Sequence, residues 1–251
     1  MSTEWETNSR ERSTLFMLRW LVAATRLLGR RLTRWVLIPT VIYFICFASV
    51  ARAASRSYLR RVLPQAPTLW NIAKHFHTFA SCALDRVVLL GGKTGGIRVN
   101  MHYTPRARAI RTSGKGCLLL MAHVGSFEAI RAKGVLEFQL PLRIVMDREH
   151  GRMYTNILEK IRPELKDFVL DSSERGPGFV LKIKQALDDQ KIVCIMADRP
   201  RVGEPQVTVD FLGDRANFPA SPWIMAGVLN VPVLIGFVLY RNGGYEAYIE
   251  D

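Results

Sequence analysis

From Ile97 to the end of the chain, short apolar runs alternate with longer amphipathic stretches. Apolar runs of about 4–8 residues are typical of buried strands, and longer stretches with helical periodicity are typical of surface helices. We expect strands at 117–122, 142–146, 168–170, 191–197, 231–240 and 245–249, helices at 126–138, 151–161, 178–188 and 221–229, and an edge strand or hairpin at 207–211. Because this alternation requires crossover connections, it predicts an α/β fold: a largely parallel central sheet flanked by helices.

A different pattern precedes this region. Residues 35–51 carry no charge, and seventeen helical residues cover about 25 Å, slightly less than the roughly 30 Å hydrocarbon core of a bilayer. Pro39 weakens a continuous helix, and arginines flank both ends, so the charge distribution does not fix an orientation. We expect a membrane anchor, either monotopic or a tilted span, with a buried core helix as the alternative. Residues 52–90 are expected to be helical, with an interruption at Pro64 and Pro67.

The charge distribution supports membrane association. The chain has a net charge of +13, and residues 1–61 contribute +8 of it through eleven arginines, three glutamates and no lysine. Arg12, Arg19 and Arg26 recur every seven residues, so on a helix they form one stripe opposite the apolar face. An anionic membrane surface is favoured over nucleic acid because the arginines interrupt apolar runs. We therefore expect an N-terminal basic membrane-anchoring helical segment at 1–61 and an α/β domain at 62–251.

Cysteine and histidine spacing argues against a disulfide framework and a metal site. Cys46, Cys82, Cys117 and Cys194 are widely spaced within apolar runs and form no CxxC pair. They predict reduced, buried thiols and a domain that faces the cytosol. The pair His75-x-His77 lacks a third ligand nearby, so no metal is expected.

One segment combines residues that could carry chemistry. The apolar run Leu118–Ala122 is followed by His123, by Gly125, which permits a tight turn, and by Ser126, which can cap the next helix. On one continuous helix His123 and Glu128 would point about 140° apart, but across a strand–turn–helix corner they can meet. Glu128 could then accept a hydrogen bond from one ring nitrogen while the other nitrogen acts as a general base on a hydroxyl. The alternatives are a structural histidine and a first-turn acid favoured by the helix dipole.

The His-x4-Glu pattern after an apolar strand resembles the His-x4-Asp/Glu motif of membrane glycerolipid and lipid A acyltransferases. The form His-Val-Gly-Ser-Phe-Glu is most similar to the bacterial lipid A biosynthesis late acyltransferase family of the lauroyl/myristoyl type. Three further stretches agree: Tyr43-Phe44 with Arg52…Tyr58-Leu59, Ile195-Met-Ala-Asp198-Arg199, and Phe211-Leu-Gly213…Phe218-Pro-Ala-Ser221-Pro-Trp223.

The resemblance implies roles for these residues. His123 would be the base on a lipid hydroxyl, with Glu128 as its partner, and Asp198 and Arg148 would lie near the acyl-transfer centre. The acyl donor would be acyl carrier protein or coenzyme A as a thioester, with no cofactor. Candidate donors to the oxyanion are Arg199 and the backbone N–H groups at the helix starts of Ser126 and Ser221. Asp198 could instead pair with Arg199, and Ser221 could instead be a helix N-cap.

We therefore expect a membrane-associated O-acyltransferase at the bacterial inner membrane, with its catalytic domain facing the cytoplasm and its acceptor a lipid A-like or other glycolipid. The Asp198-Arg199 form differs from the Asp-x-Asp of lipid A enzymes, so a lysophospholipid or pigment lipid stays open as acceptor. The alternative from another class is a non-catalytic membrane-surface scaffold. Membrane lipids and the acyl donor are the expected partners, nucleic acid is not, and the sequence does not indicate an oligomeric state.

Overall fold

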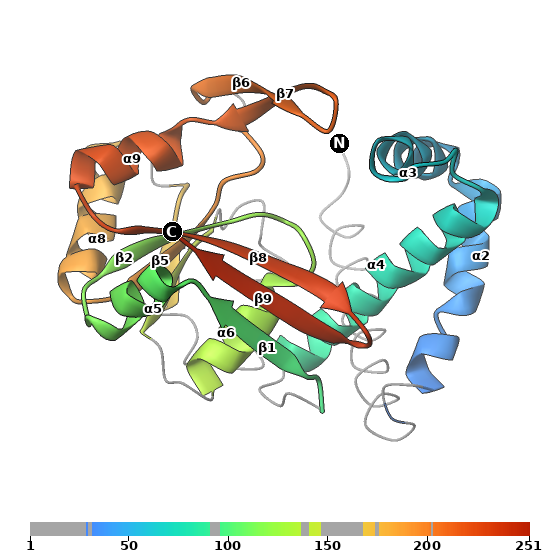
Figure 1. Ribbon diagram of the computed structural model, residues 1–251, viewed down its shortest axis with the longest axis horizontal. Helices are drawn as coiled ribbons and strands as arrows, with labels where there is room; N and C mark the ends of the chain where they lie inside the picture. Colours follow the sequence, from blue (N-terminus) through green and yellow to red (C-terminus); the bar gives the residue numbers. More distant parts are fainter. Residues whose placement is uncertain are drawn as a thin grey trace, which may run out of the picture. The chain divides into compact units, whose positions relative to one another are not determined.

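The computed structural model describes Gly29 and residues 32–90, 96–136, 141–146, 168–173, 176–201 and 203–251 (Figure 1). The chain divides into two compact units, Met1–Val88 and Leu89–Asp251. The division that we expected at residue 61 concerns membrane attachment, and it stays a prediction. The expected helix at 151–161 and the arginine stripe at Arg12, Arg19 and Arg26 lie outside the described residues.

The first unit is helical. Its main helices are α2 (Ile38–Phe47), α3 (Ser49–Val62) and α4 (Leu69–Leu90). Pro39 lies in the first turn of α2, where the missing N–H has no intrahelical partner to lose. The interruption expected at Pro64 and Pro67 is confirmed, since it falls between the end of α3 and the start of α4.

Many large apolar side chains of this unit face outward. Those exposed include Trp35, Tyr43, Phe47, Trp70 and Phe79. Among the described residues, no single helix has both the length and the apolar character needed to cross a bilayer, whereas the helical stretches Leu32–Phe47 and Ser49–Val62, bent by 95°, satisfy both criteria together. Membrane anchoring by this segment therefore stays a prediction.

Several polar side chains of the first unit contact one another or the backbone of this unit. The buried carboxylate of Asp85 accepts a hydrogen bond from the Arg34 guanidinium at 3.0 Å. His75 and His77 bind different partners. His75 Nδ1 lies 2.8 Å from Ser55 Oγ, and His77 Nε2 lies 3.3 Å from the Arg34 carbonyl oxygen. The two imidazoles thus hold helices together through separate contacts.

The second unit is built on a seven-stranded sheet of order β1-β9-β8-β2-β5-β3-β4. Its strands are β1 (Val99–Tyr103), β2 (Cys117–Met121), β3 (Leu142–Met146), β4 (Val169–Asp171), β5 (Ile192–Met196), β8 (Val233–Arg241) and β9 (Gly244–Glu250). Every neighbouring pair is parallel except β8 and β9, which form an antiparallel hairpin. The predicted α/β fold with a largely parallel sheet is confirmed.

Helices connect the strands and bury both faces of the central strand. They are α5 (Pro105–Thr112), α6 (Phe127–Leu136), α8 (Pro177–Asp188) and α9 (Ser221–Leu229). Leu118 and Leu120 of β2 pack with Ile183 of α8 and Ala226 of α9 in one buried cluster. The alternate residues of β2 are also buried, so the strand is an unbroken apolar run, as expected for a parallel strand covered on both sides.

The segment predicted at 207–211 as an edge strand or hairpin is a hairpin. It consists of β6 (Gln206–Phe211) and β7 (Asp214–Pro219), and it forms its own two-stranded sheet apart from the main one (Figure 1). The next helix, α9, begins at Ser221, but its N-cap residue is Ala220 and no side chain caps it. The N-cap reading of Ser221 is therefore wrong, because the Ala220 carbonyl already accepts the first helical hydrogen bond, from Ile224 N at 3.0 Å.

Candidate active site

His123 lies just beyond the carboxyl end of β2, the edge of a parallel sheet where ligands commonly bind. Strands β2 and β5 are parallel neighbours, and Met121 pairs with Met196 at the last position of each. The Ala197 N–H continues this pairing by donating to the Met121 carbonyl at 2.8 Å. Asp198 follows Met196 as His123 follows Met121, so the strand register brings the two side chains together.

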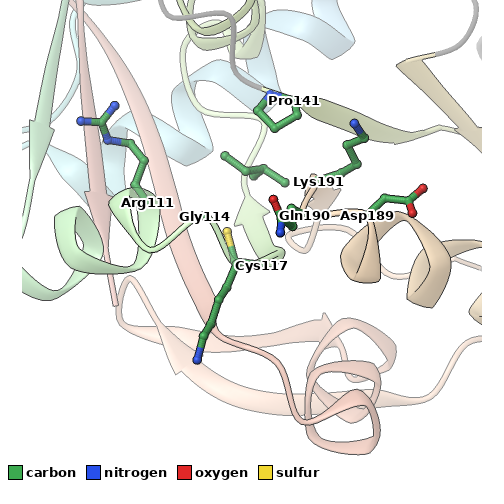
Figure 2. Close-up of a pocket in the computed structure, with 9 residues that line it drawn as sticks. Arg111, Gly114, Cys117, Pro141, Asp189, Gln190 and Lys191 are labelled. Atoms are coloured by element: carbon green, nitrogen blue, oxygen red, sulfur yellow. The ribbon is translucent and has the colours of Figure 1, made fainter.

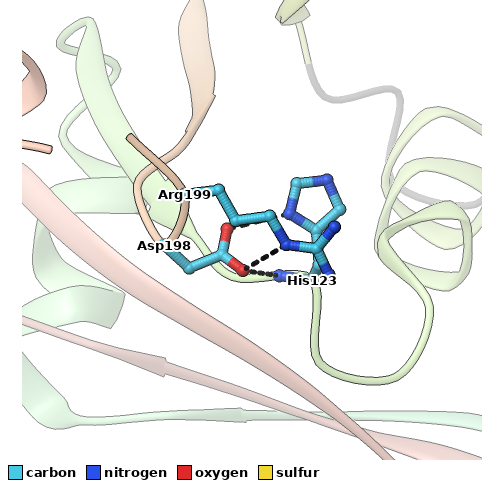
Figure 3. A network of polar contacts seen from close by, with 3 residues as sticks. All are labelled: His123, Asp198 and Arg199. Atoms are coloured by element: carbon cyan, nitrogen blue, oxygen red, sulfur yellow. Dashed lines mark hydrogen bonds and ion pairs between the residues drawn. The ribbon is translucent and has the colours of Figure 1, made fainter. Parts of the chain in front are cut away.

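Asp198 holds His123 through both carboxylate oxygens (Figure 3). Oδ1 lies 2.8 Å from the ring Nδ1, and Oδ2 accepts from the His123 backbone N–H at 3.0 Å. An ionised carboxylate only accepts hydrogen bonds, so Nδ1 carries the proton and Nε2 is left with its lone pair. The His123 side chain is 47% exposed, which leaves it open to a substrate. A fixed tautomer with an accessible Nε2 is what a general base requires.

The ionisation of Asp198 is tied to this contact. Partial burial acts to raise the pKa of Asp198, but the side-chain and backbone hydrogen bonds from His123, together with attraction to its ring, outweigh burial and lower the pKa below its usual value. The carboxylate therefore remains charged at neutral pH and stabilises a positive charge on the ring.

The turn after His123 depends on Gly125. Its φ of +71° lies in the left-handed region, and a Cβ there would stand 1.6 Å from the Val238 carbonyl oxygen of β8. Ser126, which we expected to be able to cap α6, is buried, and its Oγ has no hydrogen-bond partner among the described residues. The close approach to β8 therefore dictates the turn, and only glycine fits it.

The predicted hydrogen bond between Glu128 and the His123 ring is not the one that forms, because Asp198 occupies Nδ1. Glu128 lies in the first turn of α6, is buried, and pairs with the guanidinium of Arg131 one turn later. Arg131 also donates to the Leu89 carbonyl at 3.4 Å. The Glu128 side chain is buried in the protein interior. Strand β5 is the parallel neighbour of β2, so the residue that follows it, Asp198, lies next to His123. Whether Glu128 takes part in catalysis stays a prediction.

The other predicted site residues are dispersed. Arg199 is exposed, and its Nε lies 3.8 Å from Asp198 Oδ2, so it borders the His123–Asp198 pair (Figure 3). Ser221 is the first residue of α9, and Arg148 lies outside the described residues.

Sequence reasoning missed Arg201. Its NH2 donates to Ser172 Oγ at 2.7 Å and its NH1 to the Ser172 carbonyl at 3.4 Å. This contact ties the loop after β5 to the residue that follows β4, and so it braces the segment that carries Asp198. The available signal was a second arginine in Asp198-Arg-Pro-Arg201, a few residues beyond a predicted strand end.

A cavity of about 220 Å³ lies elsewhere, where β2 and β5 begin (Figure 2). Its lining includes Arg111, Cys117, Lys191 and Ile192. Because His123 follows the other end of β2, this cavity is not part of the His123–Asp198 site.

The core thiols are unsuited to covalent catalysis. Burial raises the pKa of Cys117 to about 11, and burial followed by the neighbouring Cys117 raises that of Cys194 further. A thiol is nucleophilic as its thiolate, so neither residue is poised to take up an acyl group. Of the four cysteines predicted to be buried, these two are buried, Cys82 is half-buried, and Cys46 is exposed.

The chain matches the model of a known protein family. The profile of a family described as bacterial lipid A biosynthesis acyltransferase matches residues 10–250, nearly the whole chain. No curated protein matches the chain.

Proposed function

Since the chain belongs to the bacterial lipid A biosynthesis acyltransferase family, we propose that it transfers a fatty acyl group from a thioester to a hydroxyl of a membrane lipid, with His123 as general base. The observation that carries the proposal is the His123–Asp198 pair at the end of β2, in which Asp198 contacts Nδ1 and the half-exposed ring can present Nε2 to a substrate. A lipid A-like or other glycolipid is the proposed acceptor, and acyl carrier protein or coenzyme A the proposed carrier of the donor thioester.

The proposed reaction needs one base and no enzyme nucleophile. Nε2 of His123 takes the hydroxyl proton as the acceptor oxygen attacks the thioester carbonyl. The tetrahedral intermediate collapses by breaking the carbon–sulfur bond, and the protonated ring returns its proton to the departing thiolate. Asp198 stabilises the imidazolium between these two steps.

Electrostatic support would come from nearby cations and dipoles. Arg199 borders the pair, and its exposed guanidinium can reach toward an oxyanion or an acidic headgroup. Its contact with Asp198 is a surface ion pair and contributes little by itself, so the side chain can reorient at small cost. The helix starts at Ser126 and Ser221 are the further candidates for oxyanion donors, and Arg148 for substrate binding.

Glu128 is proposed to support the site indirectly, by holding helix α6 in place. Its buried ion pair with Arg131 fixes the first turn of α6, the helix that follows the His123 turn. A role as a second partner of the ring is the alternative, and the two are separated by the Glu128 variants discussed below.

Membrane association is proposed to supply the acceptor. The exposed aromatic side chains of the first unit and the arginines of residues 1–61 suit an anionic bilayer surface. We place the protein at the bacterial inner membrane with the second unit on the cytoplasmic side, where acyl thioesters are available.

The test is mass spectrometry of membrane lipids from cells that produce the wild-type chain, His123→Ala, or the control His102→Ala. His102 forms a similar pair, with Nε2 2.7 Å from Glu246 Oε2 and a side chain 50% exposed, but it lies within strand β1. The proposal predicts a lipid species with one additional acyl chain for the wild type and for His102→Ala, and its loss for His123→Ala. A non-catalytic scaffold would leave lipid composition unchanged in all three strains, which would refute the proposal.

A further inference from the structure

The β6–β7 hairpin has one apolar face and one polar face. Side chains alternate along a strand, and directly opposed residues of antiparallel strands share a face. The pairing Val207↔Phe218, Val209↔Ala216 and Phe211↔Asp214 therefore places five apolar residues on one face, Val207, Val209, Phe211, Ala216 and Phe218, with Asp214 on the same face at the turn end. The other face carries Thr208, Asp210, Arg215 and Asn217.

The apolar face is open to solvent in the structure. Val207 is 51% exposed, Val209 41% and Phe211 51%. The rings of Phe211 and Phe218 pack edge-to-face with centroids 5.4 Å apart, which orders the face without covering it. An isolated two-stranded hairpin is marginally stable in water, so a face of this kind calls for an apolar partner.

Exposed apolar side chains also occur on α9, the next element in the chain. Only Ala220 separates the end of β7 at Pro219 from this helix, and Trp223, Ile224 and Val228 are exposed along it. Tryptophan is enriched where a protein meets the headgroup region of a bilayer.

The hairpin is also adjacent in the chain to the His123–Asp198 pair. The loop after Asp198 is braced at Arg201 and leads into β6 at Gln206. Only a short loop therefore separates the apolar face from the Asp198 carboxylate.

We propose that the apolar face of the β6–β7 hairpin, together with the exposed side of α9, inserts into the boundary between headgroups and acyl chains of the bilayer. The inference rests on the proposed function in one respect, that the acceptor is a bilayer lipid. It assigns the second unit a membrane contact of its own, in addition to the anchor proposed in the first unit. The hairpin's role would be to hold the end of β5 at the depth of the acceptor hydroxyl.

A bilayer fits this face better than a second copy of the chain. Six residues at about 3.4 Å and two strands about 4.8 Å apart give roughly 200 Å² of sheet face. A stable protein interface needs about 800 Å² per partner, and adding α9 does not close that difference. Shallow insertion of a few apolar side chains is enough for a peripheral membrane contact, and the net charge of +13 complements anionic lipids.

The test uses an environment-sensitive nitrobenzoxadiazole label on the full chain, with Cys46 and Cys82 changed to serine. One variant carries the label at Val209→Cys on the apolar face and its matched control at Thr208→Cys on the polar face. Both are reconstituted in vesicles of phosphatidylethanolamine and phosphatidylglycerol. If either variant misfolds, Phe211→Cys and Asp210→Cys repeat the same comparison.

We expect a blue-shifted emission and several-fold stronger quenching by lipid-borne nitroxide at Val209→Cys, while iodide in the water quenches Thr208→Cys. Iodide quenching at both positions would overturn the proposal. A label at Val209→Cys protected from both quenchers would also overturn it, since protein would then cover the face. Because the readout does not involve catalysis, acyl transfer measured on the same samples fails or succeeds independently.

Discussion

Asp198 makes two hydrogen bonds to one residue, and each has a separate effect. The bond to the His123 backbone N–H fixes the chain as it leaves β2, and the bond to Nδ1 fixes the ring. A carboxylate in this position can orient a histidine ring and balance the charge of an imidazolium without entering the reaction itself. In the proposed mechanism Asp198 is therefore a positioning residue, and its place beside His123 follows from the register of β2 and β5.

The pH dependence of stability checks the Asp198 contact. A carboxyl group whose pKa is lower in the folded than in the unfolded chain adds stability above its unfolded pKa of about 3.9. That stability is lost as pH falls through the lower, folded-state pKa. The free energy of unfolding of the wild type minus that of Asp198→Asn should therefore shrink as pH falls below about pH 4. Urea titrations measure it, and a difference that is independent of pH down to full acid unfolding would contradict the contact.

Variants of the Glu128–Arg131 pair can distinguish a structural role of Glu128 from a catalytic one. Glu128→Gln removes the carboxylate that pairs with the buried Arg131 guanidinium, so we expect a loss of about 3–5 kcal/mol in unfolding free energy. The double variant Glu128→Leu with Arg131→Met removes both charges and should recover most of that stability.

Activity of the double variant decides between the two roles. If Glu128 acts only by positioning α6, the double variant should recover both stability and acyl transfer relative to Glu128→Gln. A double variant that is stable and inactive would show that the Glu128 carboxylate is needed for chemistry.

At the scale of elements, the strand–turn–helix corner depends on one glycine. Gly125→Ala would place a Cβ against the Val238 carbonyl and force a positive φ on alanine, so it should cost at least about 1–3 kcal/mol and displace His123. The control is Gly178→Ala in α8, where a Cβ would meet nothing within 4 Å. Thermal unfolding and acyl transfer should fall for the first variant and stay near wild type for the second; equal behaviour of the two would refute this account of the turn.

The strands β2 and β5 also determine which thiols react. Near neutral pH, a maleimide should label exposed Cys46 in the native chain and reach Cys117 and Cys194 only after denaturation, because burial keeps both core thiols protonated. Peptide mass spectrometry reads out each site. Native labelling of Cys194 would contradict the buried pairing of β2 with β5.

Apolar runs in the sequence were sufficient to predict β2, β3, β5 and β8. For β2 and the centre of β5 the reason is burial on both faces, which makes a strand continuously apolar. Strand β1 was not predicted, since only Val99 of its five residues is buried and the run Val-Asn-Met-His-Tyr has no apolar block. The position of His123 directly after a strand was predicted from the sequence, and the family resemblance predicted Asp198 near the same centre. The hydrogen-bond partner of His123 was predicted to be Glu128 by closeness in sequence, whereas Asp198, 75 residues away, is brought to it by strand order, which local patterns do not encode.

At the scale of the whole molecule, the two units present complementary properties. The first carries exposed aromatic side chains and the arginines of the N-terminal region, and the second carries the His123–Asp198 pair and an apolar hairpin. Both fit the proposed function, in which an enzyme of the lipid A biosynthesis acyltransferase family acts on a membrane lipid and uses a base together with a membrane attachment.

The central claim is that His123, held by Asp198, is the base for acyl transfer, and single-turnover transfer from an acyl thioester to purified lipid acceptors tests it most directly. The variants His123→Ala and Asp198→Asn should still bind vesicles and unfold cooperatively. Their rate of acyl transfer should fall by about 10²–10⁴-fold, the range that a general base contributes. His102→Ala should transfer at the wild-type rate. Transfer at an undiminished rate by folded His123→Ala would contradict the account.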